Sequence, residues 1–124
     1  MYKATIREAS KELSAIEKIK IKDVNDALQV VDALAMGEFV VKPVMYAIID
    51  IENDRSNDKN YTKFVFVTED GTKYITGSES FINNFLGIWQ ELADANALEE
   101  DWAIKIFKKP SKNYSGDFVT CAIA

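Results

Sequence analysis

The strongest local constraint in the sequence is a turn signal, Asp70-Gly71, that stands between two runs of β-forming residues. An Asp-Gly pair favours the tight turn of a β-hairpin, because glycine adopts at little cost the positive φ that such a turn requires. The run before it, Tyr61–Thr68, and the run after it, Lys73–Thr76, are rich in aromatic and β-branched residues. The sequence therefore predicts an antiparallel hairpin over residues 61–76.

Strand and helix patterns continue on both sides of this hairpin. Further strands are predicted at Phe39–Ile51, Trp102–Lys108 and Phe118–Ile123. Pro43 lies inside the first of them and predicts an edge or a bend. Between the hairpin and the last two strands, Ser78 or Ser80 can cap a helix that runs to about Ala95. The apolar face of that helix would be Phe81, Phe85, Ile88, Trp89 and Leu92.

The order three strands, one helix, two strands predicts a mainly β fold of a particular kind. It is the order of a five-stranded OB-like barrel, in which one helix lies between strands 3 and 4. The chain has 124 residues, 48% of them hydrophobic, which suits one compact domain with a single core. We assign residues 37–124 to the barrel and residues 1–36 to an N-terminal helix and strand appendage.

Within the appendage, Lys18–Lys22 alternates lysine and isoleucine, which predicts a strand with one wet face. After it, Asp23 or Asn25 could cap a short helix that ends at Gly37. The apolar residues of that helix are Val24, Leu28, Val31 and Leu34. The appendage could pack on the barrel, mediate self-association or lie near a binding groove and regulate entry. We favour self-association.

Several function classes are disfavoured by composition. The chain has no histidine, so Ser-His and Cys-His nucleophiles are absent, and the scattered glycines form no phosphate-binding loop. The single Cys121 lies in an apolar stretch and is expected to be a buried, inert thiol. There is no run of eighteen apolar residues and no signal-peptide core, so we expect an intracellular protein with no membrane partner. We expect no enzyme activity, cofactor, catalytic residue or metal site.

Two acidic stretches offer weaker alternatives. Asp50–Asp58 is acidic like a calcium loop, but Arg55 stands where the turn glycine should be and Tyr61 where the final glutamate should be. The run of acids at 99–101 is better explained as a solvated link than as a catalytic pair. A small hydrolase is the least favoured hypothesis, and its carboxylates would be Glu99, Asp101 or Asp117.

A basic strip contrasts with the net charge of −5. Between Ala103 and Gly116 the sequence has four lysines, one phenylalanine and one tyrosine, and no acidic residue. Single-stranded nucleic acids are bound by such combinations, because ammonium groups follow the phosphates while rings stack on bases. If Ile104 and Ile106 face the core, strand alternation directs Lys105 and Phe107 outward.

The same alternation on the hairpin places Phe64 and Phe66 on one face and Tyr61, Lys63 and Val65 on the other. The latter face would supply the second half of a binding groove. The candidate nucleic-acid-binding residues are Lys42, Tyr46, Tyr61, Lys63, Lys73, Tyr74, Lys105, Phe107, Lys109, Lys112 and Tyr114.

Two stretches of the sequence resemble a known protein family. The stretch Tyr61–Ser78 resembles the central hairpin of single-stranded-DNA-binding proteins from small tailed phages, and the ending from Lys108 to Cys121 is similar too. The likeness covers the layout from about Phe39 to the C-terminus. It implies an OB-fold protein that coats and protects displaced strands during phage genome replication, in the host cytoplasm, without a cofactor. Its implied partners are single-stranded DNA and replication proteins.

One departure from the cellular proteins with that function bears on partners. Those proteins carry a disordered tail with an acidic tip, whereas residues 120–124 are apolar, which puts that recruitment route in doubt. The alternative hypothesis is an acidic protein-interaction or inhibitor module with an OB-like barrel and no nucleic-acid ligand. The low isoelectric point, about 4.8, favours it, and the lysine strip does not.

Overall fold

The computed structural model describes residues 2–53, 60–111 and 116–124. The strands are β1 (Tyr2–Ala9), β2 (Leu28–Gln29), β3 (Phe39–Val41), β4 (Pro43–Asn53), β5 (Asn60–Thr68), β6 (Lys73–Thr76), β7 (Ile104–Pro110) and β8 (Asp117–Ile123). The helices are α1 (Ala15–Lys22), α2 (Val30–Ala33) and α3 (Glu79–Asp94), and a 3-10 turn, η1, follows α2 at Leu34–Met36.

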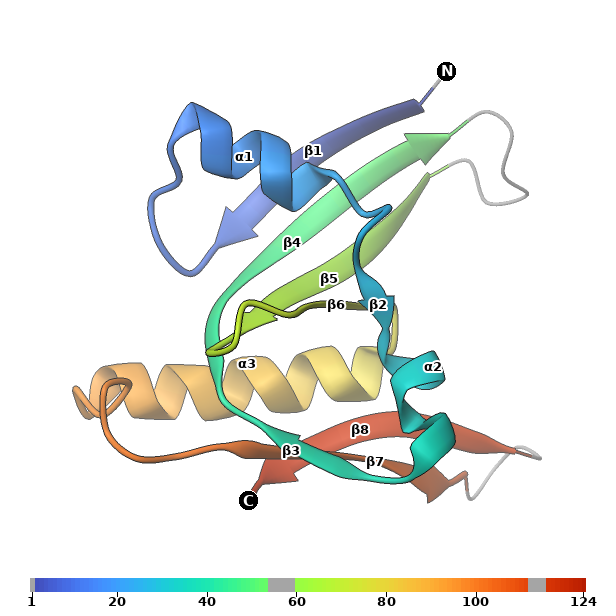
Figure 1. Cartoon of the computed structure of the whole chain (residues 1–124), viewed down its shortest axis with the longest axis vertical. Coiled ribbons are helices and arrows are strands. Elements are labelled where there is room, and N and C mark those ends of the chain that lie inside the picture. Colours follow the sequence, from blue (N-terminus) through green and yellow to red (C-terminus); the bar gives the residue numbers. More distant parts are fainter. Residues whose placement is uncertain (1, 54–59, 112–115) are drawn as a thin grey trace.

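The strands form two sheets, which Figure 1 shows above and below α3. Sheet A has the order β1-β4-β5-β6-β2, and sheet B has the order β3-β7-β8. The mainly β class is therefore confirmed. In the described residues neither sheet closes into a barrel, because β6 and β8 are not paired and β6 instead pairs with β2. The appendage thus supplies both outer strands of sheet A.

The bend predicted at Pro43 is confirmed. Strand β3 pairs with β7 in sheet B, and β4 pairs with β1 and β5 in sheet A. Only Lys42 separates β3 from β4. Pro43 is the first residue of β4, where a residue without an N–H is tolerated and the register is irregular. One nearly continuous segment therefore carries the chain from one sheet to the other.

The predicted hairpin is also confirmed. Strands β5 and β6 pair antiparallel, with Phe66 opposite Tyr74 and Val65 opposite Ile75. In the turn, Gly71 has a φ of 88°, a conformation that favours glycine. The hydroxyl of Thr68 donates to the Asp70 carboxylate, and this hydrogen bond lowers the pKa of that carboxyl.

The main core lies between sheet A, α3 and sheet B. The Ser78 side chain, one of the two predicted caps, begins α3 by accepting from the N–H of Phe81. Phe81 and Phe85 then pack against Phe64 and Phe66 from β5, with ring centroids 4.8–6.2 Å apart. The other core members are Val30, Leu34, Tyr46, Ile48, Ile104, Ile106 and Cys121.

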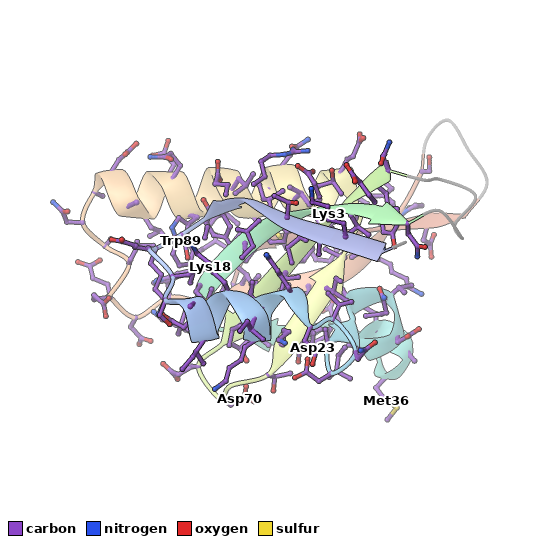
Figure 2. The ribbon with its side chains drawn as sticks, turned by 90° about the horizontal axis from the view of Figure 1, so that it is seen from above. Lys3, Lys18, Asp23, Met36, Asp70 and Trp89 are labelled. Atoms are coloured by element: carbon purple, nitrogen blue, oxygen red, sulfur yellow. The ribbon has the colours of Figure 1, made fainter. Side chains whose placement is uncertain are left out.

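The opposite face of sheet A is covered as well. Ile49 and Val65 are fully buried there, against Leu13 and Ile21 of the appendage. Figure 2 shows sheet A between α1 and α3. The expectation that the Val65 face forms an open groove is therefore wrong along most of its length.

The strand predicted at Lys18–Lys22 is wrong too, since this segment belongs to α1. Ser14 caps the helix in a capping box, accepting from the N–H of Glu17 while its own N–H donates to the Glu17 carboxylate. The Ser14 backbone, and then Lys11, lower the pKa of Glu17 to about 2. This local cap outweighs the two-residue alternation, and only Ile21 of the helix is buried.

The helix predicted from Asp23 or Asn25 to Gly37 forms only in its second half. Residues Leu28 and Gln29 make the short parallel strand β2 beside β6, so helical geometry begins at Val30. Gly37 ends the 3-10 turn with a φ of 105°, as expected of a terminating glycine.

Side chains of α3 join the helix to β8. The hydroxyl of Ser78 donates to the Val119 carbonyl at 2.7 Å, and the amide of Asn84 donates to the Cys121 carbonyl at 3.2 Å. Ser80 and Asn84 both donate to the Thr120 hydroxyl, which is buried. Side-chain hydrogen bonds therefore hold β8 where a closed barrel would have strand pairing.

Cys121 provides a test of this packing. Burial raises the pKa of its thiol to about 12, and Sγ donates to the Phe81 carbonyl at 3.6 Å. Because the thiolate is the reactive form, we expect no labelling of the native protein by an aromatic disulfide reagent at pH 8, and stoichiometric labelling after denaturation. Rapid labelling of the native protein, followed by absorbance, would contradict the packing.

Candidate functional site

The outer face of sheet B carries the predicted basic strip. Ile104 and Ile106 are buried, whereas Lys105, Phe107 and Lys109 lie on the other face of β7, as alternation predicted. The ammonium of Lys105 lies 5.3 Å from the centre of the Phe107 ring. A partly exposed ring beside a cation can stack on a base while the cation pairs with a phosphate.

Sequence reasoning missed a second ring on this face. Phe118 pairs with Lys109, and Thr120 pairs with Phe107, so Phe118 lies diagonally across from Phe107 on the same face. Phe118 is partly exposed. The signal that could have revealed it was the register of the β7–β8 hairpin, which puts alternate residues from both strands on one face.

A second lysine and ring pair lies at the end of β5. The ammonium of Lys63 is 5.9 Å from the centre of the Tyr61 ring, and it would lie 3.5 Å from a Cβ placed on Gly77. The next residue, Ser78, donates its hydroxyl to Val119 on β8. Gly77 and Ser78 therefore lie between Lys63 and β8, while the Tyr61 ring packs against the second core.

The end of β4 and the start of β5 lie on the same side of the molecule as the end of β7, the start of β8 and the start of α3 (Figure 1). The predicted residues thus form two groups, Tyr61 with Lys63 on β5 and Lys105 with Phe107 and Lys109 on β7, and Lys105 is at the end of β7 away from the hairpin turn. Lys112 and Tyr114, also predicted, lie outside the described residues.

A small hollow of about 340 Å³ adjoins Tyr61. On its wall Arg7 donates to Asp50 in an ion pair, and Thr62 donates to the same carboxylate at 3.0 Å. Arg7, and then Thr62, lower the pKa of Asp50. One of the two acidic charges that line this hollow, that of Asp50, is therefore matched by a cation within the protein.

The predicted stacking role of Tyr46 does not fit its position. The ring is only 8% exposed, stacks on Phe64 at 5.5 Å and meets Phe85 and Trp89 edge-on. Its hydroxyl donates to the Glu8 carboxylate at 3.0 Å. Burial first, and then this carboxylate, raise the pKa of Tyr46 to about 12. Tyr46 is a core residue with a satisfied hydroxyl.

Lys73 does not fit its predicted phosphate contact either. Its side chain is 11% exposed, and its ammonium donates to the carbonyls of Lys20 and Asp23 at 2.6 and 2.8 Å and to the Asp26 carboxylate at 2.7 Å. The ammonium therefore binds the C-terminal end of α1, where helix carbonyls lack partners. The same contact lowers the pKa of Asp26.

Tyr74 packs into the main core rather than into a groove. Its ring stacks on Phe66 at 5.2 Å and lies 5.7 Å from Phe39. Burial, and then Asp70, raise the pKa of its phenol. Because Tyr74 pairs with Phe66, it faces away from Tyr61 and Lys63. The predicted second half of the groove is thus reduced to those two residues.

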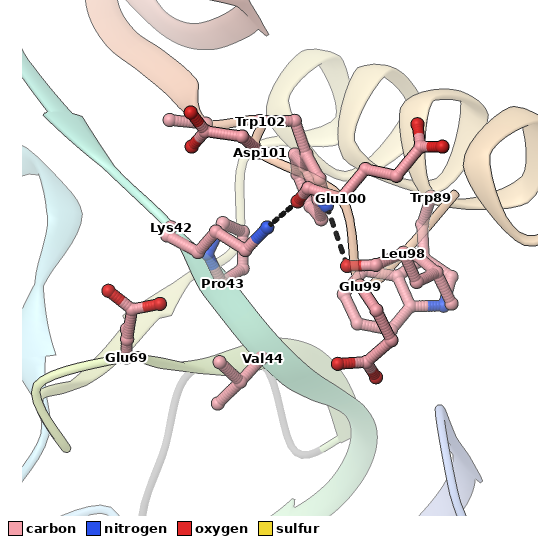
Figure 3. Close-up of a pocket in the computed structure, with 11 residues that line it drawn as sticks. Lys42, Pro43, Val44, Glu69, Trp89, Leu98, Glu99, Glu100, Asp101 and Trp102 are labelled. Atoms are coloured by element: carbon pink, nitrogen blue, oxygen red, sulfur yellow. Dashed lines mark hydrogen bonds between the residues drawn. The ribbon is translucent and has the colours of Figure 1, made fainter.

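Lys42 lies in a separate hollow of about 540 Å³, between the bend of β3–β4 and the loop after α3 (Figure 3). Its ammonium lies 4.7 Å from the centre of the Trp102 ring and donates to the Glu100 carbonyl. The indole of Trp102 donates to the Leu98 carbonyl at 2.9 Å. The acids that line this hollow are Glu69, Glu99, Glu100 and Asp101. This acidic hollow is a poor environment for a phosphate.

Other kinds of site find no support in the described part of the chain. It contains no group of three or more acidic or cysteine side chains placed to hold a metal ion. Among the same residues, no helix has the length and apolar character needed to span a membrane.

No family model matches this chain, and no curated protein or solved structure is significantly similar to it.

Tyr46 gives a prediction on pH dependence. Its pKa is higher in the folded state, about 12, than the ordinary 10.0, so its contribution to stability is complete below pH 10 and is lost as the pH rises towards 12. We expect the free energy of unfolding to fall more steeply over this interval in the wild type than in Tyr46→Phe. Equal slopes in urea titrations of the two proteins would contradict the buried phenol.

A substitution of Lys73 tests whether this lysine has a structural role or a role in nucleic-acid binding. Lys73→Met removes the donor that serves α1, so we expect a loss of about 1–2 kcal/mol of stability and a rise in the Asp26 pKa. Denaturant unfolding and NMR titration measure these effects. Affinity for an oligonucleotide should stay unchanged; an affinity loss with unchanged stability would restore the phosphate contact.

Proposed function

We propose that this protein binds single-stranded DNA with little regard to sequence. The observation that carries the proposal is the outer face of β7 and β8, where Phe107 lies between Lys105 and Lys109 on β7 and Phe118 lies opposite Lys109 on β8. Each stacked base contributes about 1–3 kcal/mol in such sites, and any base offers a ring face. Phenylalanine has no polar atom to read base edges, which supports tolerance of sequence.

The second group, Tyr61 and Lys63, lies at the hairpin end of β5, on the face of sheet A opposite α3. It adds one ring and one ammonium on the same side of the molecule. A strand that contacts both groups would follow the two hairpin ends, as single strands follow aromatic and cationic grooves. This arrangement supports a binding path longer than one nucleotide.

The connectivity supports the same proposal. From β3–β4 onward the chain has strands, the helix α3, and two more strands, with the first strand bent between two sheets. We propose that this is an open OB-like fold, in which β2 of the appendage takes the place beside β6. The intracellular, phage-type coating role that the resemblance implies would follow from such a fold.

A second candidate function is a protein-interaction module. The observation that favours it is the acidic hollow around Lys42, which is lined by two tryptophans and four acidic residues. The whole chain has a net charge of −5. Repulsion from this region does not prevent nucleic-acid binding elsewhere, because exposed charges are screened over about 10 Å at ordinary ionic strength. The two functions therefore use different surfaces.

The test of the main proposal is a titration of fluorescent oligo-dT, followed by anisotropy at low and high salt. We expect binding that weakens as salt rises, because each neutralised phosphate releases counterions. Absence of binding at low salt would sink the proposal and favour the interaction module. Duplex DNA of the same length serves as the competitor and should bind less tightly.

Single substitutions sharpen this test. Phe107→Ala should weaken oligo-dT binding by about 1–3 kcal/mol and leave thermal stability near the wild type, because the ring is partly exposed. Lys105→Met should reduce the salt slope by about 0.7. Lys42→Met is the matched control, since Lys42 also lies over a ring, but in the acidic hollow. Equal effects of the two lysine variants would contradict the assigned surface.

A further inference from the structure

The outer face of α1 has an unusual combination of residues. Ile16 and Ile19, one turn apart, are 66% and 69% exposed. Lys18 and Lys20 are also exposed; Lys20 lies beside Ile16, and Lys18 lies further round the helix, nearer to the buried side. Figure 2 shows Lys18 on α1, on the side of the molecule away from α3. We call Ile16, Lys18, Ile19 and Lys20 the α1 ridge.

This ridge is held rigidly in place. The capping box of Ser14 and Glu17 fixes the start of the helix, and the ammonium of Lys73 binds the carbonyls of Lys20 and Asp23 at its end. Ile21 anchors the buried side of α1 in the second core. A surface ordered in advance loses little conformational entropy on binding, which favours association.

The acidic hollow complements this ridge in charge and in apolar surface. Its rim carries the exposed carboxylates of Glu69, Glu99, Glu100 and Asp101, and its walls include Val44, Trp89 and Leu98. It already accepts one ammonium, that of Lys42, against Trp102 and the Glu100 carbonyl. Isoleucines beside lysines match a hollow with apolar walls and an acidic rim.

We propose that the α1 ridge of one copy docks into the acidic hollow of a second copy of this chain. Helix α1 and the loop after α3, which lines the hollow, both lie to the left in Figure 1, and Figure 2 shows Lys18 and Trp89 at that same end of the molecule. A two-fold axis can therefore place each ridge on the partner's hollow, so that the contact is made twice. One helix about 12 Å long is too small for the roughly 1,200 Å² that stable interfaces bury, and reciprocity doubles the contact.

The association is independent of nucleic acid, since it uses neither β7 nor β8. It also gives residues 1–36 the role that the sequence favoured, because α1 belongs to that segment. Two chains joined in this way keep both Phe107 faces available. A dimer would then present two binding faces to one polynucleotide.

Charge reversal with complementation tests this proposal. Sedimentation equilibrium of the full chain at rising concentration should approach twice the 14.0 kDa mass of one chain. Lys18→Glu with Lys20→Glu, and separately Glu99→Lys with Glu100→Lys, should each weaken association by about tenfold or more. An equimolar mixture of the two variants should associate again, because both contacts then join opposite charges.

The matched control is Lys108→Glu with Lys109→Glu, an equal charge change on sheet B. It should leave the mass unchanged and weaken oligo-dT binding, so a failure of DNA binding and a failure of association are seen separately. Circular dichroism should show that all variants keep the wild-type fold. A wild type that stays at one chain mass, masses that grow beyond two chains, or a mixture that does not associate would each overturn the proposal.

Discussion

The structure depends on the burial of both faces of sheet A. Phe64 and Phe66 point from β5 to α3 and sheet B, while Val65 between them points to the appendage. A strand with two apolar faces is stable only if something covers each, since every exposed large side chain forfeits about 1.5–3 kcal/mol. The long helix α3 covers one face, and the appendage covers the other with side chains from Leu13 to Ala27. The appendage is therefore part of the fold's core.

That constraint also decides where a ligand can bind. The centre of sheet A is closed on both sides, so among the described residues the partly exposed rings lie at strand ends, on sheet B and in the acidic hollow. Tyr61 with Lys63, and Phe107 with Lys105, lie in such places. Lys42 and Lys73 were also predicted to bind a nucleic acid, but their ammonium groups donate to backbone carbonyls of the protein itself. A lysine in the sequence indicates a positive charge, but it does not indicate which group that charge will bind.

Local signals predicted the elements well, and long-range packing explains what they missed. The Asp70-Gly71 turn, the Ser78 cap and the bend at Pro43 all depend on neighbours in the chain, and the structure has all three. The alternation of lysine and isoleucine in residues 18–22 was misleading, because the capping residue Ser14 lies outside that window. The unbroken apolar runs in β4 and β5 were the neglected signal, since strands buried on both faces lack alternation.

The candidate site was predicted where strand alternation alone fixes a side chain, as for Lys105 and Phe107. The prediction failed where the contacts of a side chain come from a distant segment, as for Tyr46 with Glu8 and Lys73 with α1. Phe118 escaped notice because its position relative to Phe107 depends on the register across the hairpin. Sequence patterns state which face a residue occupies and leave open what covers that face.

The side-chain link between α3 and β8 has a mechanical consequence. Sheet A and sheet B share no strand ladder in the described residues; they are joined by the chain at Lys42, by packed rings and by the hydroxyl and amide donors of Ser78, Ser80 and Asn84. Such donors can re-form with a shifted acceptor, whereas a ladder must break residue by residue. The relative position of the two sheets therefore depends on packed rings and on these three side chains of α3 and its cap, with no continuous strand ladder between the sheets among the described residues.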